Sequence, residues 1–109
     1  MILFKHFYFP PQFEKLDPRL RQIIDTMENL MWSRWHCDLL VTSIYRNDES
    51  YHRFGPPYRF IDLSLMERGN NELVREIVNK LYPRADGKKT IPDLRHGTAP
   101  HFHVQVPPT

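Results

Sequence analysis

The sequence predicts a single α+β domain in which two main helices pack on a small antiparallel β-sheet. The length of 109 residues fits one domain and is too short for two ordinary cores. Apolar residues recur at helical spacing in two segments, while alternating or β-branched runs typical of strands occupy other segments. Because helices and hairpin-like strands occur in separate runs, the pattern favours α+β architecture.

The N-terminal half contains the clearest helix. Residues 1–16 are aromatic and interrupted by prolines, which predicts an irregular arm, with the domain itself over residues 17–109. Asp17 can cap the free amides of a helix whose first residue is Pro18, since proline lacks the N–H that would go unpaired there. The helix should end near Trp35. Its apolar residues share one face: Leu20, Ile23, Ile24, Met27, Leu30 and Met31.

The remaining elements follow from alternation and turn signals. Residues 39–45 predict a buried strand, residues 47–57 a loop, and residues 58–65 a strand with alternating faces. A second helix follows Asn70 and ends before Pro83, and residues 91–95 predict a short strand. The last strand covers residues 101–106, where His101, His103 and Gln105 point to one face and apolar residues to the other.

Composition excludes several classes of protein. The net charge is +2 and no run of Lys or Arg exceeds two residues, which argues against a dedicated nucleic-acid binder. No segment approaches the roughly 18 apolar residues of a transmembrane helix, and the N-terminus lacks a secretory cleavage site. Cys37 is the single cysteine, which excludes an intrachain disulfide and fits a reducing compartment. We therefore expect a monomer made in the cytoplasm, with no membrane partner.

The histidines of the last predicted strand give the strongest indication of function. Two imidazoles two residues apart on a strand point the same way, roughly 6.5–7 Å apart. The strand face opposite His101 and His103 is apolar, so it can pack while the histidine face remains available. The simpler interpretation is a pair of ordinary histidines on a half-exposed strand.

An aspartate and a third histidine complete a possible metal set. Asp62 lies among apolar residues, where a carboxylate needs a cation, a hydrogen-bond donor or a metal; a structural role beside Arg46 or Arg59 is the alternative. His52 lies at the end of a loop, where a solvated side chain is the alternative. Two imidazoles and one carboxylate with an open position are typical of catalytic zinc, which activates water and polarises carbonyls. The same set suits iron(II) oxygenases, but their large double-sheet barrel needs more strands than this chain offers.

Four motifs occur in order along the chain: TSIYR at residues 42–46, SYHRFG at 50–55, Asp62, and HFHVQV at 101–106. Together they resemble the zinc D-alanyl-D-alanine carboxypeptidase family. That family includes phage L-alanyl-D-glutamate endolysins and is similar in core fold to lysostaphin-type peptidases and the hedgehog signalling domain. The resemblance covers roughly residues 17–107.

The resemblance implies a zinc peptidase that cleaves the stem peptides of peptidoglycan, either at the D-Ala-D-Ala bond or at the L-Ala-D-Glu bond. It also implies a phage or prophage enzyme that reaches the cell wall after release from the cytoplasm. His52, Asp62 and His103 would bind Zn²⁺, and Arg46 would hold a substrate carboxylate or carbonyl. His101 would handle protons or the oxyanion, with His96 as the reserve for that role.

Two features depart from the family pattern. The gap between His52 and Asp62 is ten residues where the family usually has seven, and residues 96–100 lack the carboxylate that often serves as general base. A histidine must then replace that base. The alternative function is a catalytically silent zinc-binding domain that binds wall peptides or a protein partner.

Overall fold

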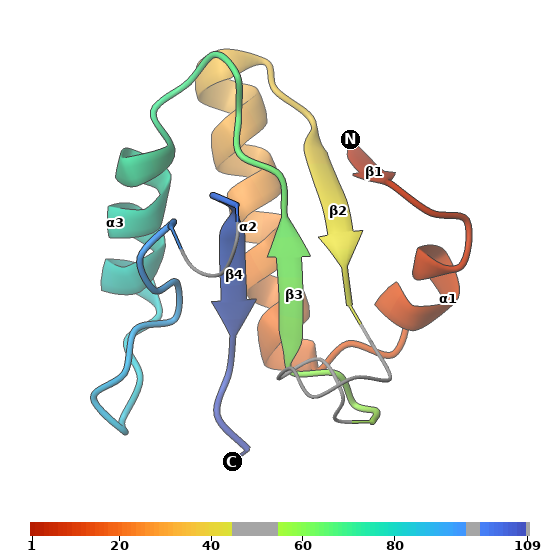
Figure 1. Cartoon of the computed structure of the whole chain (residues 1–109). Helices are drawn as coiled ribbons and strands as arrows, with labels where there is room; N and C mark the ends of the chain where they lie inside the picture. Colours follow the sequence, from red (N-terminus) through yellow and green to blue (C-terminus); the bar gives the residue numbers. More distant parts are fainter. Residues whose placement is uncertain (45–54, 96–98, 109) are drawn as a thin grey trace.

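The chain folds as an α+β domain with a four-stranded mixed sheet and three helices (Figure 1). The computed structural model describes residues 1–44, 55–95 and 99–108. In chain order the elements are β1 (Ile2–Phe4), α1 (Phe9–Phe13), α2 (Pro18–Trp35), β2 (Leu39–Ser43), β3 (Phe60–Leu63), α3 (Asn71–Leu81) and β4 (Phe102–Gln105). The α+β class predicted from the sequence is confirmed.

The sheet has the order β1-β2-β3-β4. Strands β2, β3 and β4 are antiparallel neighbours, as predicted, whereas β1 pairs with β2 in parallel. A parallel pair needs a long crossover connection. Here the connection between β1 and β2 contains α1 and α2, so the sheet is mixed.

The segment predicted as an irregular N-terminal arm is ordered into β1 and α1. Ile2 is the register partner of Leu39, and α1 contributes Phe9 and Phe13 to the buried core. A three-residue strand shows no usable alternation, and its pairing depends on a partner 37 positions away in sequence. The arm is therefore part of the fold.

Both main helices begin where the sequence predicts. The Asp17 carboxylate accepts a hydrogen bond from the Arg19 amide at 2.9 Å and caps α2, with Pro18 as the first helical residue. The Asn70 side chain accepts one from the Leu73 amide at 3.0 Å and caps α3. Helix α2 lies behind the sheet, and α3 packs beside it (Figure 1).

Residues 91–95, predicted as a short strand, are not in the sheet. Side chains of α3 bind their backbone instead: the Asn79 amide accepts from the Ile91 N–H at 2.8 Å and donates to the Ile91 carbonyl at 2.9 Å. Arg75 donates to the carbonyls of Ile91 and Pro92. The segment therefore lies between α3 and the β4 side of the sheet, where the Leu94 carbonyl accepts from the His101 amide at 2.9 Å, and it does not join the sheet as a strand.

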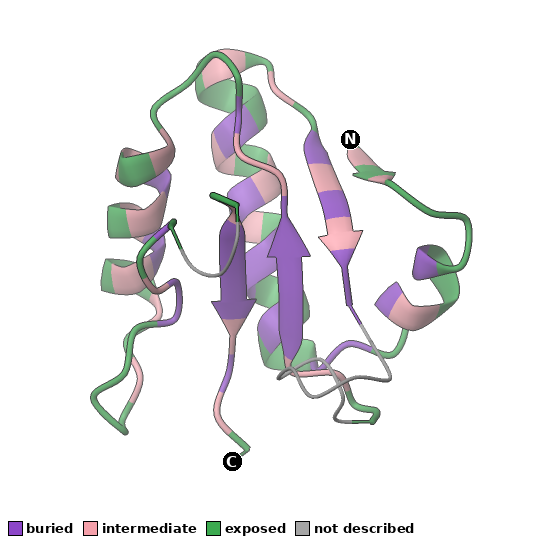
Figure 2. Ribbon diagram, viewed as in Figure 1, coloured by how far each residue is buried: buried purple, intermediate pink, exposed green. Residues whose placement is uncertain are grey.

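The core lies between α2 and the sheet. All four residues of β3 are buried, and Figure 2 shows β3 and most of β4 buried in the centre of the molecule. Within the described part of the chain, none of the helices combines the length and apolar character needed to cross a bilayer.

Candidate metal centre

Asp62 and His103 face each other across two central strands. They are register partners in the antiparallel β3–β4 pair, and such partners project to the same face of a sheet. Ile61 and Leu63, their neighbours on β3, are fully buried and point to the other face, which packs into the core. His101 directly precedes β4 and lies two residues from His103, so it falls on the Asp62 face as predicted.

Three side chains converge at this point. The Asp62 Oδ1 atom lies 2.9 Å from His103 Nδ1 and 3.4 Å from His101 Nε2. One ligand atom from each of the three residues lies within 4.8 Å of the others. Asp62, His101 and His103 therefore form a group that can hold a metal ion.

The outer ring nitrogens also have partners. His101 Nδ1 lies 2.8 Å from the Ala99 carbonyl oxygen, which can only accept, so this nitrogen carries the proton in neutral His101. The Nε2 lone pair of His101 then faces the Asp62 carboxylate. His103 Nε2 lies 3.0 Å from Gln105 Oε1, and a proton on Nε2 likewise leaves a lone pair on Nδ1 that faces Asp62.

With both outer ring nitrogens protonated, two lone pairs and a carboxylate oxygen point at one another, an arrangement that a cation between them would stabilise. A proton can bridge one of the pairs, and a metal ion can satisfy all three at once. Ligands about 2.0–2.1 Å from a tetrahedral zinc are about 3.4 Å apart from each other, which is close to the separations found here. Carbonyl or carboxamide oxygens that accept from the outer ring nitrogens are the usual orienting partners of metal-bound histidine. The donor set therefore suits a metal ion.

A β-bulge lies beside this group. Val41 pairs with Leu63, but Ser43 pairs with Asp62, so Thr42 is the extra residue on β2. Bulges are common next to functional sites because they redirect side chains. The Ser43 hydroxyl is buried and has no hydrogen-bond partner among the described residues.

Three of the predicted site residues, Arg46, His52 and His96, lie outside the described residues. The structure brings together the other three, Asp62, His101 and His103. Sequence reasoning did not assign a role to Gln105, although the alternation of the last strand already placed it on the histidine face. It also gave no role to the Ala99 carbonyl, for which the sequence holds no signal.

No protein-family model, curated protein or solved structure matches this chain. The fold and the metal-binding group therefore rest on the residues and the geometry described above.

Proposed function

We propose that this protein is a zinc-dependent peptidase that hydrolyses peptide bonds in the stem peptides of peptidoglycan. The observation that carries the proposal is the position of Asp62 Oδ1, 2.9 Å from His103 Nδ1 and 3.4 Å from His101 Nε2. The four motifs shared with the carboxypeptidase family, in the same order along the chain, support the same activity.

His52, Asp62 and His103 are the proposed zinc ligands. Zinc, when bound, supplies Lewis-acid chemistry, polarising a peptide carbonyl and lowering the pKa of water. Asp62 and His103 are suited to holding the ion because both are buried and paired at 2.9 Å. A buried carboxylate and imidazole are held in one orientation, as a ligand set requires.

His101 is the proposed proton carrier. Its side chain is 22% exposed, against 4% for His103, so a substrate can reach its ring more readily. The Ala99 carbonyl holds the proton on Nδ1 and leaves Nε2 able to accept a proton from water and to donate it to the leaving amine. His96 is the reserve for this role, and Arg46 is proposed to bind a carboxylate or carbonyl of the peptide through its planar guanidinium.

The test is release of amino groups from purified peptidoglycan, with zinc content measured on the same preparation. The zinc-loaded protein should release amines, chelation should abolish the release, and added zinc should restore it. Mass spectrometry of the products identifies the bond that is cleaved.

Two variants serve as controls. Asp62→Ala should lose both zinc and activity, while His6→Ala, which removes an exposed histidine at the other edge of the sheet, should keep both. Full zinc occupancy without amine release would contradict the peptidase proposal and support the silent zinc-binding domain.

A further inference from the structure

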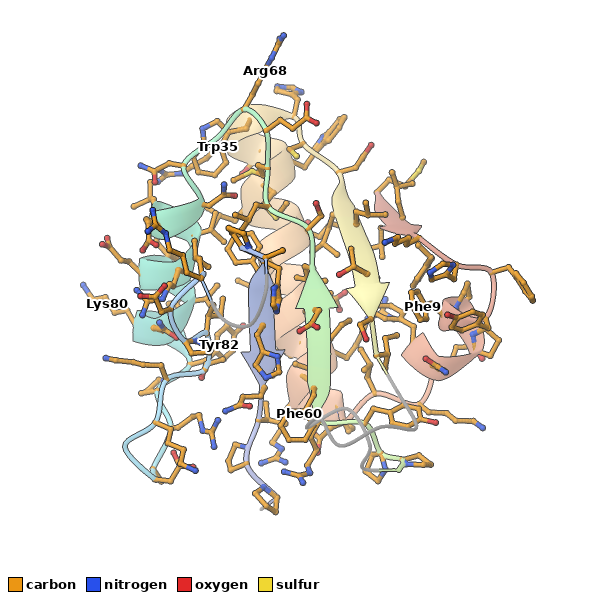
Figure 3. The ribbon with its side chains drawn as sticks, viewed as in Figure 1. Phe9, Trp35, Phe60, Arg68, Lys80 and Tyr82 are labelled. Atoms are coloured by element: carbon orange, nitrogen blue, oxygen red, sulfur yellow. The ribbon has the colours of Figure 1, made fainter. Side chains whose placement is uncertain are left out.

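A pocket of about 400 Å³ opens next to the metal-binding group. It lies where β3 begins and β4 ends, and the segment that follows α3 forms its other wall (Figure 1). Figure 3 shows Phe60, one of the lining residues, at this end of the sheet. The polar side chains of the lining come from all three segments: Arg59, Arg84, Asp86, Lys88, His103 and Gln105.

The pocket is positively charged. Arg59, Arg84 and Lys88 contribute three positive charges against the single negative charge of Asp86. The Arg84 guanidinium donates to both Asp86 oxygens and lowers the pKa of the Asp86 carboxyl, so this carboxylate stays ionised and pairs with Arg84. A concave surface with such an excess attracts anions.

The wall that carries two of these cations is ordered by its own contacts. Arg84 Nε donates to Asp86 at 3.1 Å, and the same carboxylate accepts from the Lys88 amide at 3.0 Å. Gly87 adopts the positive φ of 79° that this turn requires and that a side chain disfavours. The turn thereby holds Arg84 and Lys88 on the same pocket without a bound ligand.

Arg84 has an unused donor. Its side chain is only 7% exposed, and Nη1 is buried with no hydrogen-bond partner among the described residues. A buried donor without a partner is unfavourable. The Arg84 Nε and Nη2 atoms already donate to the two Asp86 oxygens in a planar, paired geometry. A ligand oxygen that reaches Nη1 would therefore satisfy the remaining donor of Arg84.

The pocket and the metal-binding group share His103, and Gln105 lies two residues further along the same strand face. Two residues along a strand span about 6.5–7 Å, which is also the length of about two residues of an extended peptide. An anion in the pocket is therefore one or two residues from a peptide bond placed at the metal.

We propose that this pocket is a specificity subsite that binds a carboxylate of the substrate one or two residues from the scissile bond, through Arg59, Arg84 and Lys88. The inference rests on the proposed peptidase function, because it places the carboxylate relative to the bond that is cleaved. Stem peptides offer such groups at their glutamate residue and at their C-terminus.

The experiment compares a stem pentapeptide with two forms in which the glutamate carboxylate or the C-terminal carboxylate is a carboxamide. The zinc-loaded protein should prefer the acid over one of the amides by at least about tenfold in kcat/KM, as expected for charge-assisted hydrogen bonds. Lys88→Glu should reduce this preference to less than about threefold. Arg59→Gln should also reduce the preference for the acid. Lys89→Glu changes the net charge by the same amount at a lysine outside the pocket lining, and this control should keep the preference.

Binding to the zinc-loaded protein, followed by NMR chemical shifts of residues 86–88 and 105, separates this inference from the proposed function. Carboxylate-dependent shifts that Lys88→Glu abolishes, without hydrolysis of any peptide, would support the subsite and contradict the peptidase. Hydrolysis with equal preference in Lys88→Glu and Lys89→Glu would overturn the subsite and leave the peptidase standing. Equal shifts with inorganic phosphate would also overturn it, because the pocket would then be a general anion site. If neither hydrolysis nor carboxylate-dependent shifts occur, both proposals fail.

Discussion

His103 Nδ1 lies 2.9 Å from Asp62 Oδ1, and its other ring nitrogen lies 3.0 Å from Gln105 Oε1. A neutral imidazole has one N–H and can donate to only one of these oxygens. The pair is buried, so its surroundings are low in water. A cation at Nδ1, either a proton or a metal ion, allows both ring nitrogens of His103 to be paired.

Asp62→Ala and His103→Ala should each lose most bound zinc, because each removes a ligand atom from the buried group. Zinc at 100 times its Kd should stabilise the native protein by about 2.7 kcal/mol, and this stabilisation should be absent from both variants. Elemental analysis and thermal unfolding with and without zinc measure the two effects. His6→Ala, at an exposed position, is the control. Normal zinc content in both variants would refute the metal centre.

His101→Ala should keep its zinc and lose about 100-fold or more in turnover, the usual scale for a general acid–base group. The reason is that the side chain of His101 is 22% exposed, so substrate and water can reach its ring, while His52 is the proposed third ligand. Zinc content and hydrolysis rate must come from the same preparation. Loss of zinc in this variant would show instead that His101 is a ligand.

Gln105→Ala should weaken zinc binding by about 10–100-fold, the range found for partners that orient a metal-bound histidine. The Gln105 Oε1 atom lies 3.0 Å from His103 Nε2, and accepting a hydrogen bond from this nitrogen would leave the Nδ1 lone pair to bind the metal. Gln105→Glu keeps an acceptor at this position and should retain most of the affinity. Competition with a chelator of known affinity measures both variants, and equal affinity for Gln105→Ala and the native protein would exclude the orienting role.

Asp17→Ala should destabilise the protein by about 1 kcal/mol at neutral pH, because α2 loses its N-cap. The side-chain hydrogen bond from Arg19 is the main cause that lowers the pKa of Asp17 in the folded state. A depressed folded-state pKa gives stability above the unfolded value, about 3.9, that is lost as the pH falls through the folded-state pKa. The difference between native and variant in denaturant unfolding should therefore shrink between pH 5 and pH 2. Asp17→Asn should keep the cap and show a weaker pH dependence.

Ser43→Ala should change the free energy of unfolding by less than about 0.5 kcal/mol or increase it, since its buried hydroxyl has no partner among the described residues. Thr90→Val is the matched comparison: Thr90 is also buried, but its hydroxyl donates to the Tyr82 carbonyl at 2.6 Å. Thr90→Val should lower the free energy of unfolding by about 1–3 kcal/mol, because the Tyr82 carbonyl loses its hydrogen-bond donor. Equal losses in urea unfolding would show that the Ser43 hydroxyl is paired.

The sequence by itself determined the features that depend on neighbours along the chain. Helical spacing and the capping residues Asp17 and Asn70 predicted α2 and α3, and the structure confirms both starts. Alternation placed His101, His103 and Gln105 on one strand face, because side chains in a strand alternate whatever the strand pairs with. Helical spacing, capping and strand alternation each depend only on residues that are close together in the sequence.

Only the tertiary structure decided which segments meet. The register of β3 against β4 places Asp62 opposite His103, and a shift of one residue would turn the carboxylate to the other face. Likewise, side chains of α3 bind the backbone of residues 91–92, and the preceding turn places Arg84 and Lys88 at the pocket beside His103. Strand register and the path of a loop depend on packing between residues distant in sequence, which periodicity cannot report because it records only the spacing within one segment.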